Sequence, residues 1–194
     1  MFQEHHEQQA RQYGWMEVIA GSMFSGKTEE LIRRAKRAEI AKLSVQLFKP
    51  MTDNRFADAE VVSHDRSALS CVPVDSSAHL LILAQGYQVV GVDEAQFFDD
   101  GIVEVCNQLA NQGIRVIIAG LDMDSEGRPF GPMPNLMATA EYVTKVHAIC
   151  ARSGSPAHYS HRLDQSNDAQ VQLGEVGDYE PLSRAEFNRT RQKV

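Results

Sequence analysis

An eight-residue stretch near the amino terminus constrains the fold of this chain more than any other feature. It follows an apolar run at residues 15–20 and opens an amphipathic segment at residues 27–42, so it joins a predicted strand to a predicted helix. The stretch fits the pattern G-x-x-x-x-G-K-[S/T], and its residues are Gly21, Ser22, Met23, Phe24, Ser25, Gly26, Lys27 and Thr28. Glycines let successive backbone N–H groups point inward, and the helix amino terminus adds partial positive charge. The stretch therefore predicts a phosphate-binding loop, or P-loop.

The last two residues of this loop are expected to carry most of its chemistry. Lys27 is expected to reach the β- and γ-phosphates of ATP, and the Thr28 hydroxyl is expected to bind the accompanying Mg²⁺. The alternative is a glycine-containing turn that happens to precede a lysine. The flanking strand and helix disfavour that alternative.

Short apolar runs alternate with amphipathic segments along most of the chain. The runs at residues 15–20, 43–48, 87–92 and 115–120 are rich in branched and aromatic residues, which predicts strands buried on both faces. Helical spacing of apolar residues predicts helices over 27–42 and 99–113. Strands that alternate with helices imply right-handed βαβ units. We therefore expect an α/β fold of the P-loop NTPase, RecA-like type, with a mostly parallel sheet flanked by helices.

The composition of the sequence changes from about residue 145, after which small and polar residues dominate. This part contains one short predicted strand, residues 169–173. We expect three parts. Residues 1–13 are a polar, flexible segment, residues 14–146 form the ATP-binding domain, and residues 147–194 form a small loop-dominated module with a tail.

Composition excludes several classes of partner and location. The 194 residues are 43% hydrophobic and 23% charged, as in globular proteins, and the formal net charge of −7 should repel a nucleic-acid polymer. Three scattered cysteines argue against a disulfide framework. No signal-like core and no apolar run of about 18 residues is present, so no membrane association is expected. We expect a cytoplasmic protein.

Two carboxylates follow the third of the predicted strands. Asp93 should lie at the carboxyl tip of that strand, where it can bind Mg²⁺ directly or through water. Strand alternation would aim Glu94 away from Asp93 and toward a phosphoryl acceptor, as suits a general base. A solvated strand-end carboxylate and the water-activating base of an ATPase are the alternatives for Glu94. Ala95 and Gln96 complete the predicted ATP-binding segment.

Four blocks in the right order resemble the small, tetrameric, P-loop type of thymidine kinase. The blocks are GSMFSGKT; KPMTDNR with SHDR; VDEAQFF; and GLDMD with PFGPMPNLMATAEYVTKVHAIC. The likeness extends from about residue 15 to residue 183. It implies transfer of the γ-phosphate of ATP to the 5′-hydroxyl of thymidine, in DNA precursor synthesis, by a homotetramer.

The resemblance also implies roles for individual residues. Glu94 matches the base that accepts the 5′-hydroxyl proton, and Asp53 and Arg55 match residues near the metal and the transferring phosphoryl group. An arginine there can neutralise charge on the phosphoryl oxygens, although taken alone Arg55 would be an exposed loop arginine. The residues that match the family's nucleoside pocket are Met23, Phe97, Leu121, Phe130, Val171, Gln172, Leu173, Gly174 and Tyr179. Four of them, Val171, Gln172, Leu173 and Gly174, match the "lasso" loop that folds over the nucleoside in this family.

The chain departs from the family pattern at two places. Ser125 and Glu126 stand where most relatives have phenylalanine and arginine, which is expected to loosen the pocket. Relatives commonly hold the lasso module with a zinc ion on four ligands; here Cys150 occupies the first position, but Ser153, Ser183 and Glu186 occupy the others. One thiolate does not make a tetrahedral site, so zinc is not expected, unless His147, His158 or His161 supplies replacement ligands.

Three hypotheses follow from these patterns. The first is a nucleoside kinase. The second is an ATP-dependent regulatory or binding protein on the same scaffold, which would not need a base aimed at an acceptor. The third is a weakly active family member that binds nucleoside.

Overall fold

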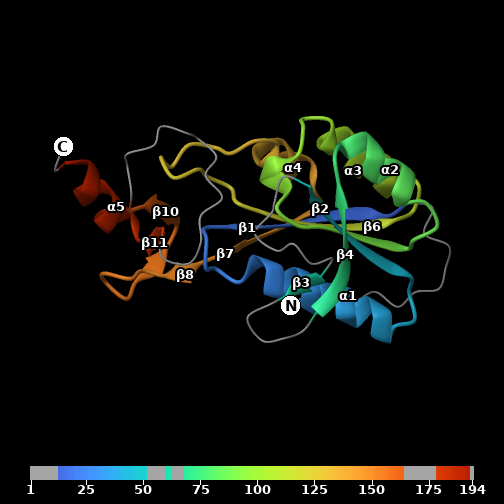
Figure 1. Ribbon diagram of the computed structural model, residues 1–194, viewed down its shortest axis with the longest axis horizontal. Helices are drawn as coiled ribbons and strands as arrows, with labels where there is room; N and C mark the ends of the chain where they lie inside the picture. The colour runs from blue at the N-terminus through green and yellow to red at the C-terminus, as the bar shows by residue number, and fades with distance from the viewer. Residues whose placement is uncertain (1–12, 52–59, 63–67, 164–177, 193–194) are drawn as a thin grey trace.

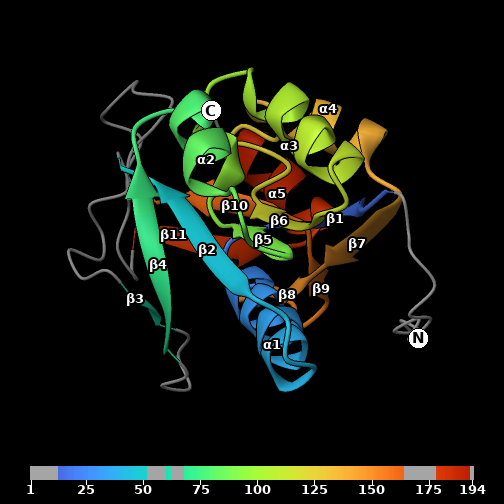
Figure 2. The same ribbon diagram turned by 90° about the vertical axis from the view of Figure 1, so that its right-hand side faces the viewer.

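A single twisted sheet organises the chain in the computed structural model, which describes residues 13–51, 60–62, 68–163 and 178–192. The strand order is β3-β4-β2-β5-β6-β1-β7, and every neighbouring pair is parallel except β3 with β4 (Figures 1 and 2). The strands are β1 (Trp15–Gly21), β2 (Val45–Pro50), β3 (Glu60–Val62), β4 (Ala68–Val74), β5 (Val89–Val92), β6 (Arg115–Gly120) and β7 (Tyr142–Val146).

Helices cover both faces of this sheet, as the alternating sequence pattern predicts. Figure 2 shows α1 (Lys27–Ile40) below the sheet and α2 (Ser77–Leu83) with α3 (Ile102–Asn111) above it, where α4 (Met133–Thr139) also packs. Each face has its own apolar core. Leu31, Ile32 and Ala35 of α1 pack with Ile19 and Ile117 on one side, and the larger cluster on the other side includes residues from α2, α3 and α4.

The α/β, RecA-like expectation is confirmed. The P-loop follows β1 and the acidic segment follows β5, and β6 lies between these two strands in the sheet. The four predicted strands and two predicted helices are present, with boundaries that differ by a few residues: the predicted helices 27–42 and 99–113 span 27–40 and 102–111. None of the described helices is long and apolar enough to cross a membrane.

Residues 148–163 and 178–192 form a small unit at one end of the molecule, here called the C-terminal module (Figure 1). It contains two short antiparallel ribbons and one helix: β8 (Ala148–Ile149) with β9 (Pro156–Ala157), β10 (Tyr159–Arg162) with β11 (Tyr179–Leu182), and α5 (Arg184–Arg191). The predicted strand at 169–173 lies outside the described residues, and so does nearly all of the predicted segment 1–13.

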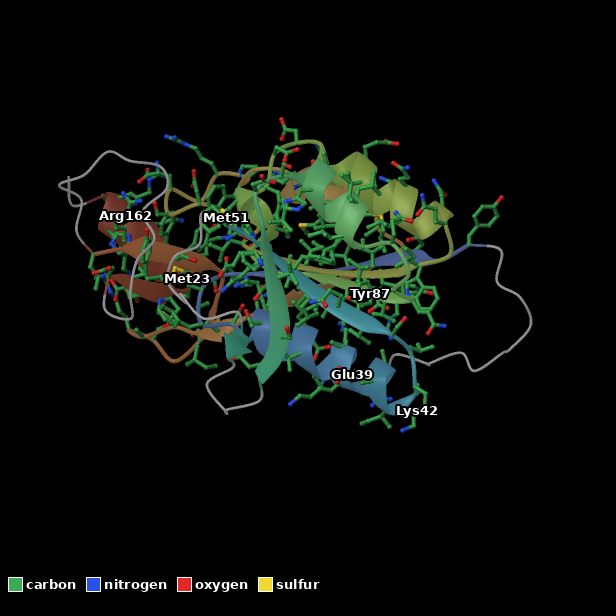
Figure 3. The ribbon with its side chains drawn as sticks, turned by 45° about the vertical axis from the view of Figure 1, so that its right-hand side comes forward. Met23, Glu39, Lys42, Met51, Tyr87 and Arg162 are labelled. Atoms are coloured by element: carbon green, nitrogen blue, oxygen red, sulfur yellow. The ribbon has the colours of Figure 1, made fainter. Side chains whose placement is uncertain are left out.

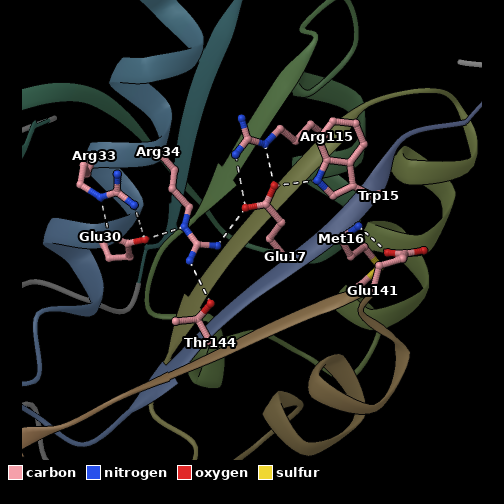
Figure 4. A network of polar contacts seen from close by, with 9 residues as sticks. All are labelled: Trp15, Met16, Glu17, Glu30, Arg33, Arg34, Arg115, Glu141 and Thr144. Atoms are coloured by element: carbon pink, nitrogen blue, oxygen red, sulfur yellow. Dashed lines mark hydrogen bonds and ion pairs between the residues drawn. The ribbon is translucent and has the colours of Figure 1, made fainter. Parts of the chain in front are cut away.

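A buried group of charged side chains fixes α1 against the sheet. Glu17 of β1 is only 1% exposed and accepts hydrogen bonds from Arg34 of α1 at 2.9 Å, from Arg115 of β6 at 2.7 Å and from the Trp15 indole at 2.6 Å (Figure 4). Arg34 also donates to Thr144 of β7 at 3.0 Å. The network joins the strand that precedes the P-loop to the helix that follows it.

Candidate active site

The P-loop connects the end of β1 to the start of α1. A Cβ on Gly21 would lie 2.3 Å from the Val146 carbonyl oxygen, so only glycine allows the loop to pass the end of β7. Gly26, at φ 82°, adopts the left-handed conformation directly before the helix, and none of the described side chains caps the first turn of α1. The first N–H groups of α1 therefore meet the requirement for binding an anion.

Lys27 lies folded back on this loop. Its ammonium group donates to the Ser22 carbonyl at 2.8 Å, and the Ser25 hydroxyl donates to the same oxygen at 2.7 Å. Burial lowers the pKa of Lys27, while the nearby carboxylates of Glu94, Asp93, Asp122 and Glu29 oppose the shift. The carboxylates favour the charged form of the ammonium group, and burial strengthens the attraction of that charge to a bound polyphosphate.

Thr28 and Asp93 lie together, as predicted. The Thr28 hydroxyl donates to Oδ2 of Asp93 at 3.1 Å, and Asp93 is 6% exposed. Burial and the neighbouring Glu94 raise the pKa of Asp93 to about 7. A hydroxyl beside a carboxylate, both hard oxygen donors, fits Mg²⁺ bound together with nucleotide phosphates.

The strand-alternation argument for Glu94 is wrong, because β5 ends at Val92. Glu94 instead adopts a left-handed conformation at φ 50°, directly before the short 3₁₀ helix η1 (Ala95–Phe97). Its backbone N–H donates to Asp93 Oδ1 at 2.9 Å, and its carboxylate accepts a hydrogen bond from the Gln96 side chain. The turn therefore places Glu94 beside Asp93, while the Glu94 carboxylate is held by a different partner, Gln96.

Part of the predicted nucleoside pocket comes together beyond this turn. Phe97 and Phe130 meet edge to face with ring centroids 5.7 Å apart, and the Leu121 N–H donates to the Gln96 side chain at 2.9 Å. Tyr179, on β11, accepts a hydrogen bond from Arg162 at 3.3 Å. The predicted site residues Asp53, Arg55, Val171, Gln172, Leu173 and Gly174 lie outside the described residues.

Sequence reasoning missed two further residues at this site. Ser160 of β10 is 5% exposed and accepts a hydrogen bond from the Met23 N–H at 2.9 Å, so the C-terminal module contacts the P-loop directly. Figure 3 shows Met23 toward the end of the molecule that carries Arg162, far from Glu39 and Lys42. No sequence pattern singles out Ser160.

The second is Asp122, just after β6. Its Oδ2 pairs with Lys145 at 2.5 Å, and its buried Oδ1 has no hydrogen-bond partner within the part of the chain that the structure describes. Its position after a predicted strand is the same signal that identified Asp93, so it could have been found.

The departures from the family pattern occupy a turn and the C-terminal module. Ser125 and Glu126 lie in a turn held by Asp124, which accepts from the Glu126 and Arg128 N–H groups at 2.9 Å each. The Glu126 carboxylate is exposed and lies 3.9 Å from Arg191 of α5. The turn therefore faces the C-terminal helix at this point.

The residues at the four zinc-ligand positions do not fit a zinc ion. Ser183 caps α5 by accepting from the Glu186 N–H at 3.4 Å, and the Glu186 carboxylate pairs with Arg189. Cys150 is the one soft donor among them. Among the described residues, no three His, Cys, Asp or Glu side chains are grouped to hold a metal. Of the candidate substitutes, His147 contacts His158, with ring centroids 4.5 Å apart, whereas His161 contacts Phe187.

A phosphate loop at the end of β1, a hydroxyl–carboxylate pair for Mg²⁺ and a RecA-like strand order together define a P-loop nucleotide-binding protein. Comparison with known proteins makes the assignment specific. A family model described as thymidine kinase matches residues 14–187, nearly the whole chain. The chain therefore belongs to the thymidine kinase family.

Relatives of high identity carry the same name. A thymidine kinase of Bacteroides thetaiotaomicron is 58% identical over 191 residues, which are 98% of this chain and 96% of the relative. One from Bacteroides fragilis is 57% identical over 193 residues, or 100% and 96% of the two chains. One from Porphyromonas gingivalis is 57% identical over 91% of this chain and 86% of its own.

Proposed function

We propose that this kinase transfers the γ-phosphate of ATP to the 5′-hydroxyl of thymidine and gives thymidine monophosphate. The observation that carries the proposal is the placement of Glu94, whose carboxylate is held by Gln96 immediately beside the Thr28–Asp93 pair. A protein that only switches on ATP binding does not need a second oriented carboxylate there. The thymidine kinase relatives supply the choice of acceptor.

Each step of the transfer is assigned to a residue of the chain. Lys27 and the first N–H groups of α1 bind the phosphates and offset the charge that develops on the transferred group. Thr28 and Asp93 would hold Mg²⁺ together with the nucleotide, and the ion would supply charge neutralisation at the phosphates. Glu94 accepts the proton of the 5′-hydroxyl as that oxygen attacks the γ-phosphorus, the bond from phosphorus to the β-phosphate oxygen breaks, and ADP leaves. Arg55 is proposed to stabilise the transferring group, and Asp53 to lie beside the metal.

The nucleoside is proposed to lie against the Phe97–Phe130 pair, with Met23, Leu121 and Tyr179 around it. A flat pyrimidine stacks well on aromatic side chains, which is worth about 1 to 3 kcal/mol per base in nucleic-acid complexes. Ser160 supports this arrangement because it holds the backbone of Met23 in place. Val171 to Gly174 complete the proposed pocket.

The decisive experiment is incubation of the purified protein with MgATP and each common nucleoside in turn, followed by chromatography of the products. We expect ADP and thymidine monophosphate in equal amounts, with thymidine the preferred acceptor. ADP formed without a monophosphate would indicate an ATPase, and nucleotide binding without turnover would favour a regulatory protein. Light scattering would test the homotetramer that the family resemblance implies, and cell fractionation would test the cytoplasmic location.

A further inference from the structure

The C-terminal module has a small apolar core of its own. Its buried members are Ala148, Cys150, Ala157, Tyr159, Leu182 and Phe187, and Met123 from the neighbouring turn packs against them. Six buried side chains, of which only Tyr159 and Phe187 are large, bury little surface, and a module of this size usually needs a further stabilising feature. In this module, contacts between its turns, its ribbons and α5 provide that stabilisation.

Aromatic stacking contributes to the stability of the C-terminal module. The rings of Tyr159 on β10 and Phe187 on α5 are stacked, with centroids 4.2 Å apart and planes 9° apart. Arg184 lies 5.4 Å from the Tyr159 ring and Arg191 lies 5.8 Å from the Phe187 ring. Stacked pairs and cation–π contacts both add to the energy of apolar burial. The four side chains join helix α5 to the β10–β11 ribbon.

Cys150 belongs to the same core. It is 2% exposed and lies at the start of a tight turn, in which its N–H donates to the Ser155 carbonyl at 2.8 Å and its carbonyl accepts from the Gly154 N–H at 2.9 Å. The N–H of the next residue, Ala151, donates to the Pro181 carbonyl at 3.0 Å, so the turn after β8 is joined to the β10–β11 ribbon.

We propose that the C-terminal module of this chain is metal-independent, and that the Tyr159–Phe187 stack and the turn at the buried Cys150 hold it together as a zinc ion does in family members with four thiolate or imidazole ligands. The oxygen atoms that replace the other three ligands already have other roles. Ser183 caps α5, the Glu186 carboxylate pairs with Arg189, and the Ser153 hydroxyl accepts a hydrogen bond from the Ser155 N–H at 3.4 Å. The inference does not depend on which acceptor the enzyme phosphorylates.

Metal content and thermal unfolding of the full-length protein test metal independence without any activity assay. We expect far less than one zinc per chain by elemental analysis of protein purified without chelator, and a melting temperature that neither a strong chelator nor added ZnCl₂ changes. About one zinc per chain together with a melting temperature lowered by chelator would overturn the proposal.

Substitutions of Cys150 distinguish a buried core residue from a metal ligand. Cys150→Ala removes one buried sulfur from the apolar core, so it should lower the midpoint of urea unfolding by the same amount with and without chelator. Cys150→Ser places a hydroxyl among apolar side chains and should also lower the midpoint independently of chelator. Losses in the two variants that disappear when wild type and variants are compared in chelator would indicate a metal ligand and overturn the proposal.

Substitutions of Phe187 test the stack. Phe187→Leu keeps an apolar side chain but removes the ring, so it should lower the melting temperature less than Phe187→Ala and more than the control Tyr13→Ala, whose side chain is 58% exposed. Should Phe187→Ala fail to fold, Phe187→Leu still decides the matter. A melting temperature of Phe187→Leu equal to that of wild type would remove the stack from the proposal.

Discussion

Removal of the buried carboxylate of Glu17 should destabilise the whole protein. In Glu17→Ala, the Arg34 guanidinium, 3% exposed, loses its 2.9 Å partner but keeps Glu30 at 2.8 Å and Thr144 at 3.0 Å. Breaking a buried ion pair by removing one partner costs about 3 to 5 kcal/mol. Because Glu30 still compensates Arg34, and because the Arg115 side chain is 12% exposed, we expect the lower end of that range, about 3 kcal/mol.

Urea unfolding at one fixed protein concentration measures this loss. The matched control is Glu30→Ala, which removes the other carboxylate of Arg34 at a site that is 21% exposed and should cost about 1 kcal/mol or less. A double variant, Glu17→Met with Arg34→Met, should be more stable than Glu17→Ala alone, because it leaves only Arg115, the more exposed of the two arginines, without the Glu17 carboxylate. A loss in Glu17→Ala no greater than that in Glu30→Ala would refute the reasoning.

Three further predictions concern catalysis and pH. Lys27→Ala should lower kcat/KM by roughly 10²- to 10³-fold or more while circular dichroism and melting temperature stay near those of wild type, and near-normal turnover would remove Lys27 from the phosphate site. Glu94→Gln should lower kcat by about 10²- to 10⁴-fold with ADP affinity little changed in calorimetry; a loss seen only in Asp93→Asn would move the base role away from Glu94. Burial lowers the pKa of His158 and of His161 below the ordinary value of 6.5, so the unfolded chain binds more protons below that pH. The midpoint of urea unfolding should therefore fall as the pH decreases below about 6.5, and it should fall less in His158→Gln. A midpoint that rises on acidification would contradict the lowered pKa values of the two histidines.

The core of the fold could be predicted from the sequence because its strands are buried on both faces. β1, β5 and β6 consist almost entirely of apolar residues, and the P-loop fixes which strand leads into which helix. Residues 142–146 gave no such signal, because β7 is the last strand of the described sheet and keeps Tyr142 and Val143 44% exposed. Pro73 within β4 argues against a strand, since proline cannot donate to a ladder, yet it pairs in register with Lys49 of β2.

The site itself could be predicted only in part, because some of its contacts are long-range. The P-loop, Thr28 and Asp93 follow from local patterns, whereas the contact of Met23 with Ser160 joins residues 137 positions apart. The C-terminal module gave little signal for a similar reason. Its ribbons are two to four residues long, and its stack joins β10 to α5.

Glu94 lies beside the phosphate-binding residues, but not for the reason that strand alternation suggests. Period-two alternation assumes that the strand continues, but the chain leaves β5 after Val92 and turns through a positive φ at Glu94, a conformation that costs a non-glycine residue about 1 kcal/mol or more. Surrounding contacts must therefore determine the turn. Gln96 provides two of them, since its side chain donates to the Glu94 carboxylate and accepts from the Leu121 N–H, while Gly131 passes so close that a Cβ there would lie 2.4 Å from the Gln96 carbonyl oxygen. One buried amide thus connects the proposed base, the turn that carries it and the backbone of the proposed nucleoside pocket.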